Sequence, residues 1–251
     1  MKYAHFLITH FNLPKWSKDK HNVSTQTEEW LEHRFGLFQR YCLPSVASQT
    51  SKDFTWILLF YNKTPEKYKN LNRKFENQYS WYKPCYLNDE ESSHMVEYIN
   101  KFITGYIEPD TEFIITTRLD NDDSIAVDFM EDVENFAKKR GATENYAIDP
   151  IHGIEYYPKY NLSKNHSYNR THFSSYVEPI SQHIRNIYGS GVHGRADVNY
   201  TIYQINKEAM WMEVIHEKNV CNDFCLGALE PLYKRFPADR FAVEPIQGGG
   251  I

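Results

Sequence analysis

The sequence of 251 residues has few cysteines, no long apolar run and no basic excess, and each of these shortages excludes a class of protein. Its four cysteines form no C-x-x-C pair, so we expect reduced thiols and no zinc site. No stretch approaches 18 uninterrupted apolar residues, so we expect no transmembrane segment, which leaves peripheral membrane association open. With 28 Lys and Arg against 33 Asp and Glu, and no long basic block, the chain is not predicted to bind nucleic acid.

The first residues, MKYAHFLITHF, turn polar too soon for a signal peptide, and we therefore expect a cytoplasmic protein. Aromatic residues are abundant at 16%. We expect most of them to pack in a core, although aromatic side chains also stack on sugar rings in open clefts.

Short apolar runs alternate with amphipathic stretches over the first 140 residues. The apolar runs predict strands at residues 3–9, 53–61, 81–87 and 112–119, and the amphipathic stretches predict helices at 28–42, 66–78, 91–105 and 124–140. The continuous apolar character of residues 53–61 favours a sheet covered on both faces, hence parallel strands with helices between them. The pattern predicts an α/β fold of Rossmann type, with a mostly parallel central sheet flanked by helices.

The second half of the chain is less regular. Its patterns predict strands at residues 201–206 and 209–215, helices at 178–188 and 223–235, and a loop over most of 156–172. No linker or internal repeat interrupts the chain, so we expect a single domain over residues 1–251.

An acidic segment follows the last strand predicted in the first half. In residues 112–124, EFIITTRLDNDDS, an apolar run leads to Asp120, Asp122 and Asp123. A solvated loop that caps the next helix is one interpretation. A calcium loop of the EF-hand type is a second, but it requires glycine where Ile125 stands. A third is a site where Mg²⁺ or Mn²⁺, held by the D-x-D carboxylates, bridges the two phosphates of a nucleotide-sugar. We favour the third, because ligands of such sheets bind at the carboxyl ends of the strands.

Four segments together resemble a known family. The strings TRLDNDD, HFLITHFN, CLPSVASQTSKDFTWILLF and MWMEVIHEKN are similar to those of the "putative rhamnosyltransferase" family of bacterial proteins, over residues 4 to about 223. The resemblance implies a GT-A-like glycosyltransferase domain in which residues 1–140 bind the nucleotide-sugar and residues 141–251 the acceptor. It also implies transfer of a sugar from a UDP- or dTDP-sugar to a polysaccharide or other glycan.

The GT-A pattern also implies roles for individual residues. The metal, Mn²⁺ or Mg²⁺, would be held by Asp120, Asp122 and a late histidine, His216, while Asp123 would support them or cap the helix. Arg118 would pair with a phosphate. The nucleotide would be contacted by residues at the ends of the strands, namely Thr9, His10, Asn12, Asn62 and Asn121.

An inverting transfer also needs a general base that deprotonates the acceptor hydroxyl. The carboxylates placed between the D-x-D motif and His216 are Asp149, Glu155, Glu178, Asp197 and Glu213. We expect Glu178 to be the base, with Asp197 second, although Glu178 could instead only favour the start of a helix.

Two other functions are compatible with the sequence. A nucleotidyltransferase would use the same sheet edge, but it would want a glycine-rich loop after the first strand, and THFNLPKW has no glycine. A non-catalytic carbohydrate-binding protein would use the aromatic residues, but it would not need three carboxylates at the end of one strand.

Overall fold

A computed structural model describes residues 2–18, 22–181, 183–193, 200–217, 219 and 237–244. The helix expected at residues 223–235 and the candidate base Asp197 lie outside these ranges. Within them, no helix combines the length and the apolar character needed to cross a bilayer.

The first half of the chain alternates strands and helices as predicted. Its elements are β1 (Tyr3–His10), η1 (Pro14–Trp16), α1 (Glu28–Leu37), η2 (Phe38–Cys42), α2 (Leu43–Ala47), β2 (Thr55–Tyr61), α3 (Glu66–Gln78), β3 (Tyr82–Leu87), α4 (Asp89–Ser93), α5 (Met95–Thr104), β4 (Phe113–Arg118), β5 (Ser124–Ile125) and α6 (Phe129–Arg140). Local signals set several boundaries. Thr27 caps α1 by accepting a hydrogen bond from the Trp30 N–H, and Gly141 ends α6 with a φ of 72°, a value that favours glycine.

The central sheet has seven strands in the order β10-β6-β9-β4-β1-β2-β3. From the second half of the chain it takes β6 (Tyr146–Pro150), β9 (Ser175–Pro179) and β10 (Thr201–Ile205). Each neighbouring pair is parallel except the two that contain β9, which runs antiparallel between β4 and β6. The predicted fold class, α/β with a mostly parallel sheet flanked by helices, is therefore confirmed.

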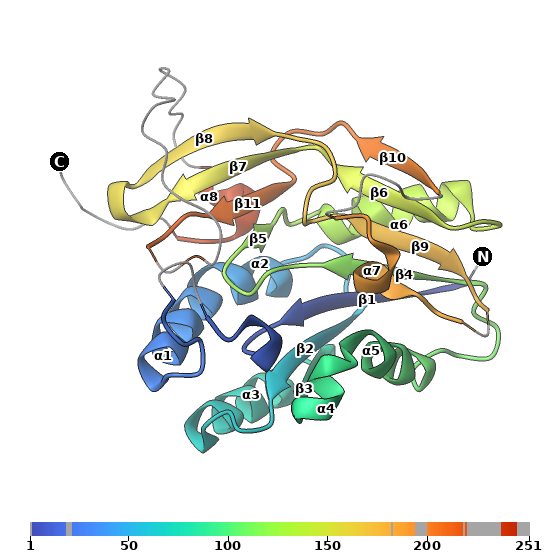
Figure 1. Ribbon diagram of the computed structural model, residues 1–251. Helices are drawn as coiled ribbons and strands as arrows, with labels where there is room; N and C mark the ends of the chain where they lie inside the picture. The colour runs from blue at the N-terminus through green and yellow to red at the C-terminus, as the bar shows by residue number, and fades with distance from the viewer. Residues whose placement is uncertain are drawn as a thin grey trace.

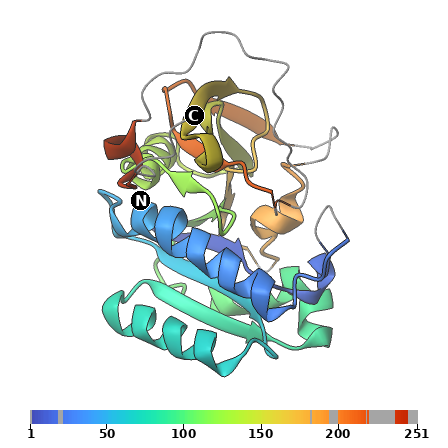
Figure 2. The same cartoon turned by 90° about the vertical axis from the view of Figure 1, so that its left-hand side faces the viewer.

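Side chains alternate across the sheet, so both faces are apolar and both are covered. On β2, Trp56, Leu58 and Phe60 pack with α1, α2, α3 and α6. Ile57 and Leu59 point the other way, into a second core built with α5 and with α7 (Asn186–Ser190). Figure 1 shows α3 and α4 beside β2 and β3 in the lower part of the view, with α5 to their right, and Figure 2 shows α1 lying across the sheet. This two-sided burial explains the uninterrupted apolar character of residues 53–61.

A smaller sheet lies beyond the acidic loop, at the top of Figure 1. Its order is β5-β11-β7-β8, with β7 (His152–Tyr157), β8 (Leu162–Ser167) and β11 (Trp211–Val214); η3 (Pro158–Tyr160) joins β7 to β8, and α8 (Ala238–Phe241) follows later in the chain. Trp211 is paired with Gly153 and lies flat against it, since a Cβ at Gly153 would be 2.1 Å from the indole ring. The Trp211 ring is therefore close-packed on the neighbouring strand of the small sheet.

Three predictions about secondary structure were wrong. Residues 178–188 are not one helix, because residues 175–179 form the inserted strand β9, and only Asn186–Ser190 are helical. Residues 156–172 contain strand β8, which pairs with β7. The helix expected from residue 124 starts at Phe129, because Ser124 and Ile125 pair with β11.

Candidate active site

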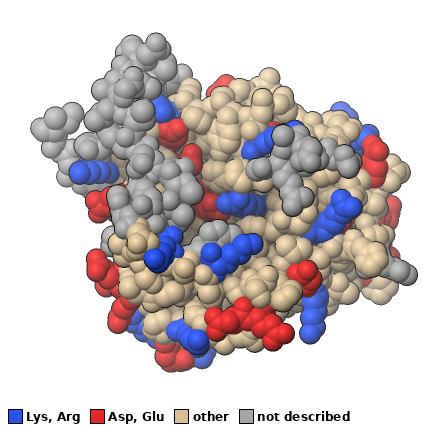
Figure 3. Space-filling model, in the orientation of Figure 1, with Lys and Arg blue, Asp and Glu red and all other residues tan. Residues whose placement is uncertain are grey.

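A pocket of about 600 Å³ opens at the carboxyl edge of the central sheet. One wall consists of Phe11, Leu13, Thr25, Trp30 and Arg34, from the segment after β1 and from α1. The other wall consists of residues of the small sheet and the adjoining segments. The loop after β4 lies between the walls and contributes Asp120, Asn121, Asp122 and Asp123. Acidic and basic side chains are interspersed on the face shown in Figure 3, whereas three carboxylates of one loop line the pocket.

Asp120 is held by the residue at the end of its own strand. The Arg118 guanidinium donates from Nε to one carboxylate oxygen at 3.1 Å and from Nη2 to the other at 3.0 Å. Burial alone would raise the pKa of Asp120, but the charge of Arg118 lowers it well below its usual value. Asp120 is therefore ionised in the pocket.

Asp122 is held by residues that are distant in sequence. Its carboxylate forms a buried ion pair with Arg34 of α1, and His216 Nε2 lies 2.9 Å from its Oδ2. Burial opposes ionisation here too, but Arg34 and His216 lower the pKa of Asp122 to about 2. The predicted ligands Asp122 and His216 are thus brought together, but they bind each other and Arg34.

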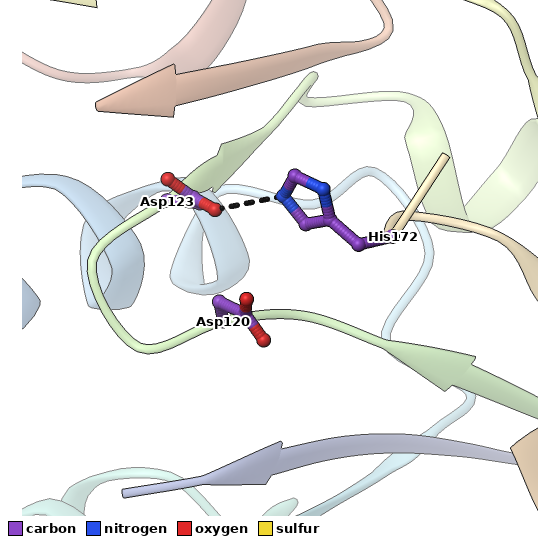
Figure 4. A group of neighbouring side chains, drawn as sticks. All are labelled: Asp120, Asp123 and His172. Atoms are coloured by element: carbon purple, nitrogen blue, oxygen red, sulfur yellow. Dashed lines mark hydrogen bonds and ion pairs between the residues drawn. The ribbon is translucent and has the colours of Figure 1, made fainter. Parts of the chain in front are cut away.

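Asp123 reaches the opposite side of the loop. Its Oδ1 accepts a hydrogen bond from the backbone N–H of Val214 at 2.9 Å, and its Oδ2 lies 3.1 Å from Nε2 of His172. Figure 4 shows this contact, with Asp120 beside the pair. Ligand atoms of Asp120, Asp123 and His172 lie within 4.8 Å of one another, and among the described residues this is the group of three or more His, Cys, Asp or Glu side chains close enough to hold a metal ion.

Asp149, a candidate base in the sequence, instead fixes the segment that carries His172. Its fully buried carboxylate accepts hydrogen bonds from the Thr171 N–H at 2.9 Å, the Thr171 hydroxyl at 3.0 Å and the Ser174 hydroxyl at 2.9 Å. His172 is thereby held facing Asp123.

The chemistry of this group fits a divalent cation. Two carboxylates and an imidazole nitrogen are ligands that Mn²⁺ accepts, whereas Mg²⁺ is usually bound through oxygen alone. The Nδ1 of His172 lies 2.9 Å from the Tyr168 hydroxyl, a second partner of the kind that orients metal-binding histidines. Burial lowers the pKa of His172, which favours the neutral ring that binds metals.

The local electric field points to the same conclusion. Burial raises the pKa of Asp123 well above its usual value, and the neighbouring carboxylates of Asp122 and Asp120 raise it further. Each of those two carboxylates is matched by one guanidinium, whereas Asp123 is held by a backbone N–H and a histidine. A bound cation would relieve this excess of negative charge.

The residues predicted to contact the nucleotide divide into two groups. His10, Arg118 and Asn121 line the pocket, and burial lowers the pKa of His10 to about 4, so its ring is neutral. Thr9 and Asn12 are buried away from the lining: Thr9 accepts a hydrogen bond from the Trp56 indole, and Asn12 bonds with Thr64 and the Tyr61 N–H. Asn62 is exposed and also outside the lining. The amide of Asn121 donates to the backbone oxygens of residues 10 and 11 and so ties the acidic loop to the end of β1.

Glu178 is not in the pocket. Because β9 runs antiparallel, Glu178 is paired with Ile114 near the start of β4, at the opposite edge of the sheet from the acidic loop. Its buried carboxylate accepts hydrogen bonds from the backbone N–H groups of Arg185 and Asn186, at 3.0 and 2.9 Å. Glu178 therefore bonds to the start of α7, but it belongs to strand β9 and not to the first turn of a helix. Two other candidates from the sequence, Glu155 and Glu213, do line the pocket.

Sequence reasoning missed Arg34, His172, Tyr168 and Trp30. Arg34 and Trp30 belong to the helix predicted at residues 28–42, but nothing in the local pattern shows which of its side chains reach the acidic loop. The sequence signal for His172 would have been the alternation of side-chain character in residues 174–178, SSYVE. This alternation indicates a strand that begins three residues after His172, which places His172 just ahead of the strand.

Comparison with known proteins defines the class. A family model described as "Putative rhamnosyl transferase" matches residues 10–226, so the chain belongs to this family of glycosyltransferases. Among curated proteins, none matches the chain.

Two solved structures are similar at low identity. S. aureus TarS has 10% identity and a TM-score of 0.42; the match covers 86% of this chain and 37% of TarS, so the chain spans little more than a third of its length. The inositol-1-phosphate CTP transferase from T. maritima has 12% identity and a TM-score of 0.34, covering 84% of this chain and 89% of that one.

Proposed function

We propose that the protein is a metal-dependent glycosyltransferase that moves a sugar from a nucleoside-diphosphate donor to a hydroxyl of a glycan acceptor. The sugar is rhamnose if the family's description holds for this member. The observation that carries the proposal is the convergence of Asp120, Asp123 and His172 at the carboxyl edge of a parallel sheet, inside a pocket that also contains two arginines.

In this proposal, Asp120, Asp123 and His172 hold Mn²⁺ in preference to Mg²⁺. The cation would neutralise the charge that develops on the diphosphate as the sugar leaves. Asp122 and His216, which the resemblance implied as ligands, then have a different role: their bonds with each other and with Arg34 fix the acidic loop against α1.

The two arginines are suited to the phosphates of the donor. Arg118 and Arg34 both line the pocket next to the acidic group, and each can offer further N–H donors to phosphate oxygens. The apolar wall of Phe11, Leu13 and Trp30 would receive the nucleobase of a UDP- or dTDP-sugar. The opposite wall, which comes from residues after 141, would receive the acceptor, a polysaccharide or another glycan.

The test is calorimetric titration of UDP and dTDP in the presence of Mn²⁺, Mg²⁺ or EDTA. We expect nucleotide binding that depends on metal and is tighter with Mn²⁺. Asp123→Asn should weaken it by at least tenfold, and Asp110→Asn, at an exposed carboxylate that precedes β4 whereas the acidic loop follows it, serves as the matched control. Binding that is equally tight with EDTA, or equally tight in Asp123→Asn, would contradict the metal site. A donor panel of UDP-, dTDP- and GDP-sugars would then identify the substrate.

A further inference from the structure

Two glutamates face each other across the small sheet. Glu213 of β11 and Glu155 of β7 are register partners in a parallel pair, so their side chains project from the same face. Both line the pocket, on the wall opposite α1. Two carboxylates in one pocket can perform different tasks only if their surroundings differ.

Glu155 is saturated with partners. Its carboxylate lies 2.8 Å from Lys164 Nζ and 2.7 Å from His166 Nδ1, and it also accepts a hydrogen bond from the Tyr157 hydroxyl. Burial would raise its pKa, but these three groups lower it to about 2. Glu155 is therefore a fixed negative charge with little capacity to take a proton.

The electrostatic environment of Glu213 shifts its pKa in the other direction. Its side chain is buried, and burial, followed by the charge of Asp123, raises its pKa to about 7. A pair of carboxylates whose affinities for a proton are pushed apart in this way is the usual arrangement of an acid or base and its neighbour.

The backbone fixes where Glu213 lies relative to the acidic group. The next residue, Val214, donates its backbone N–H to Asp123 Oδ1 at 2.9 Å. The position of the Glu213 carboxylate is therefore tied, through one residue of strand β11, to the group proposed to hold the donor's diphosphate.

We propose that Glu213 is the general base of the transfer and that Glu155 is a positioning residue that keeps the neighbouring charge constant. This inference rests on the proposed function. The acceptor O–H bond breaks and its proton moves to the Glu213 carboxylate, while the acceptor oxygen forms a bond to the anomeric carbon of the donor sugar. The bond from that carbon to the diphosphate breaks at the same time, and its electron pair leaves on the diphosphate oxygen. A single displacement of this kind inverts the anomeric configuration.

Among the described residues, two other carboxylates that the sequence offered as the base are held elsewhere. Asp149 is engaged by the segment that carries His172, and Glu178 lies at the far edge of the sheet. Among the candidates that the structure describes, Glu155 and Glu213 line the pocket, and Glu213 is the one whose strand is bonded to Asp123 through the next residue, Val214.

The experiment measures two quantities for the same variants. The first is the Kd of UDP in the presence of Mn²⁺. The second is the rate at which nucleoside diphosphate is released from the sugar donor that the wild type cleaves fastest, with water in place of the acceptor. Glu213→Gln should leave the Kd within threefold of the wild type and slow release by about 100-fold or more. Glu213→Asp, which keeps a carboxylate, should fall between the two, and Glu208→Gln, at an exposed site, is the matched control.

The outcomes separate the two proposals. If Glu213→Gln releases the diphosphate within threefold of the wild-type rate, or if its nucleotide binding is lost together with turnover, Glu213 is not the base. If the wild type binds no UDP with Mn²⁺, the proposed function itself fails. Thermal unfolding of each variant shows whether a loss of rate reflects a loss of folded protein.

Discussion

Replacing the middle carboxylate of the acidic loop should affect stability rather than metal binding. In Asp122→Asn the buried Arg34 loses its charged partner, and His216 loses a carboxylate acceptor. The pKa of Asp122, lowered from 3.8 to about 2, corresponds to about 2.5 kcal/mol of stabilisation of the ionised form. Breaking a buried ion pair by removing one of its partners typically costs about 3–5 kcal/mol. We therefore expect Asp122→Asn to lose about 3 kcal/mol of unfolding free energy.

The neighbouring substitution should do the reverse. In Asp123→Asn a carboxyl whose pKa is raised by burial and by two nearby carboxylates becomes a neutral amide, so repulsion within the loop falls. We expect the free energy of unfolding in EDTA to stay the same or rise, while Mn²⁺ affinity falls by tenfold or more. The two variants differ by one position in the sequence and should move in opposite directions.

The assay is thermal unfolding in EDTA, combined with calorimetric titration of Mn²⁺. For a chain of this length about 3 kcal/mol corresponds to a decrease in Tm of roughly 6–12 °C. Asp110→Asn, at an exposed ion pair with Lys2, should change neither quantity measurably. The reasoning is refuted if Asp122→Asn unfolds at the wild-type temperature but no longer binds Mn²⁺, because Asp122 would then be a ligand, as the D-x-D pattern alone suggested.

Three further predictions concern residues that support the site. Burial would raise the pKa of Glu134, but its hydrogen bond with His5 lowers that pKa below 4.5. The ionised Glu134 should therefore contribute about 2 kcal/mol to the free energy of unfolding. This contribution should be complete above pH 4.5 and lost as the pH falls through the pKa that Glu134 has in the folded state. Unfolding in denaturant at pH 7 and pH 4 should show this loss in the wild type and not in Glu134→Gln. Gly153→Ala should reduce the free energy of unfolding by about 1–3 kcal/mol and so lower the Tm, because the new methyl group overlaps the Trp211 ring. An unchanged Tm would contradict that packing. Asp149→Asn should weaken Mn²⁺ binding by about 10–100-fold in calorimetry, and an unchanged affinity would mean that the His172 segment holds its position without it.

The sequence predicted the parts of the fold that depend on local pattern. Residues 53–61 are apolar at nearly every position, which only a strand buried on two faces requires, and β2 is such a strand. The strand predicted at residues 81–87 also contains Pro84, which has no backbone N–H to donate and so favours an edge position, and β3 lies at an edge of the sheet. In these cases the cause and the result are both within a few residues.

The candidate site was predicted less well, because the directions of the Asp122 and Asp123 side chains are set by residues far away in sequence. Asp120 and Asp122 are adjacent in a D-x-D pattern, but Arg34 turns one of them towards α1, while Val214 and His172 hold Asp123. None of these partners lies within 45 residues of the loop in sequence. The location of the site at the strand end followed from topology, whereas the choice between neighbouring carboxylates needed the tertiary contacts.

The insertion of β9 into the sheet also determines the order in which the protein can assemble. Strands β1 to β4 can pair with one another as soon as residue 118 is available, since the three pairs that join them need no later residue. His172 can reach the acidic loop only when the segment ahead of β9 docks, and β9 closes pairs such as Ile115 with Val177. Contacts this distant in sequence form slowly. During synthesis the parallel core would therefore form first, and the group of Asp120, Asp123 and His172 would be completed later, when β9 is added to a sheet that already exists.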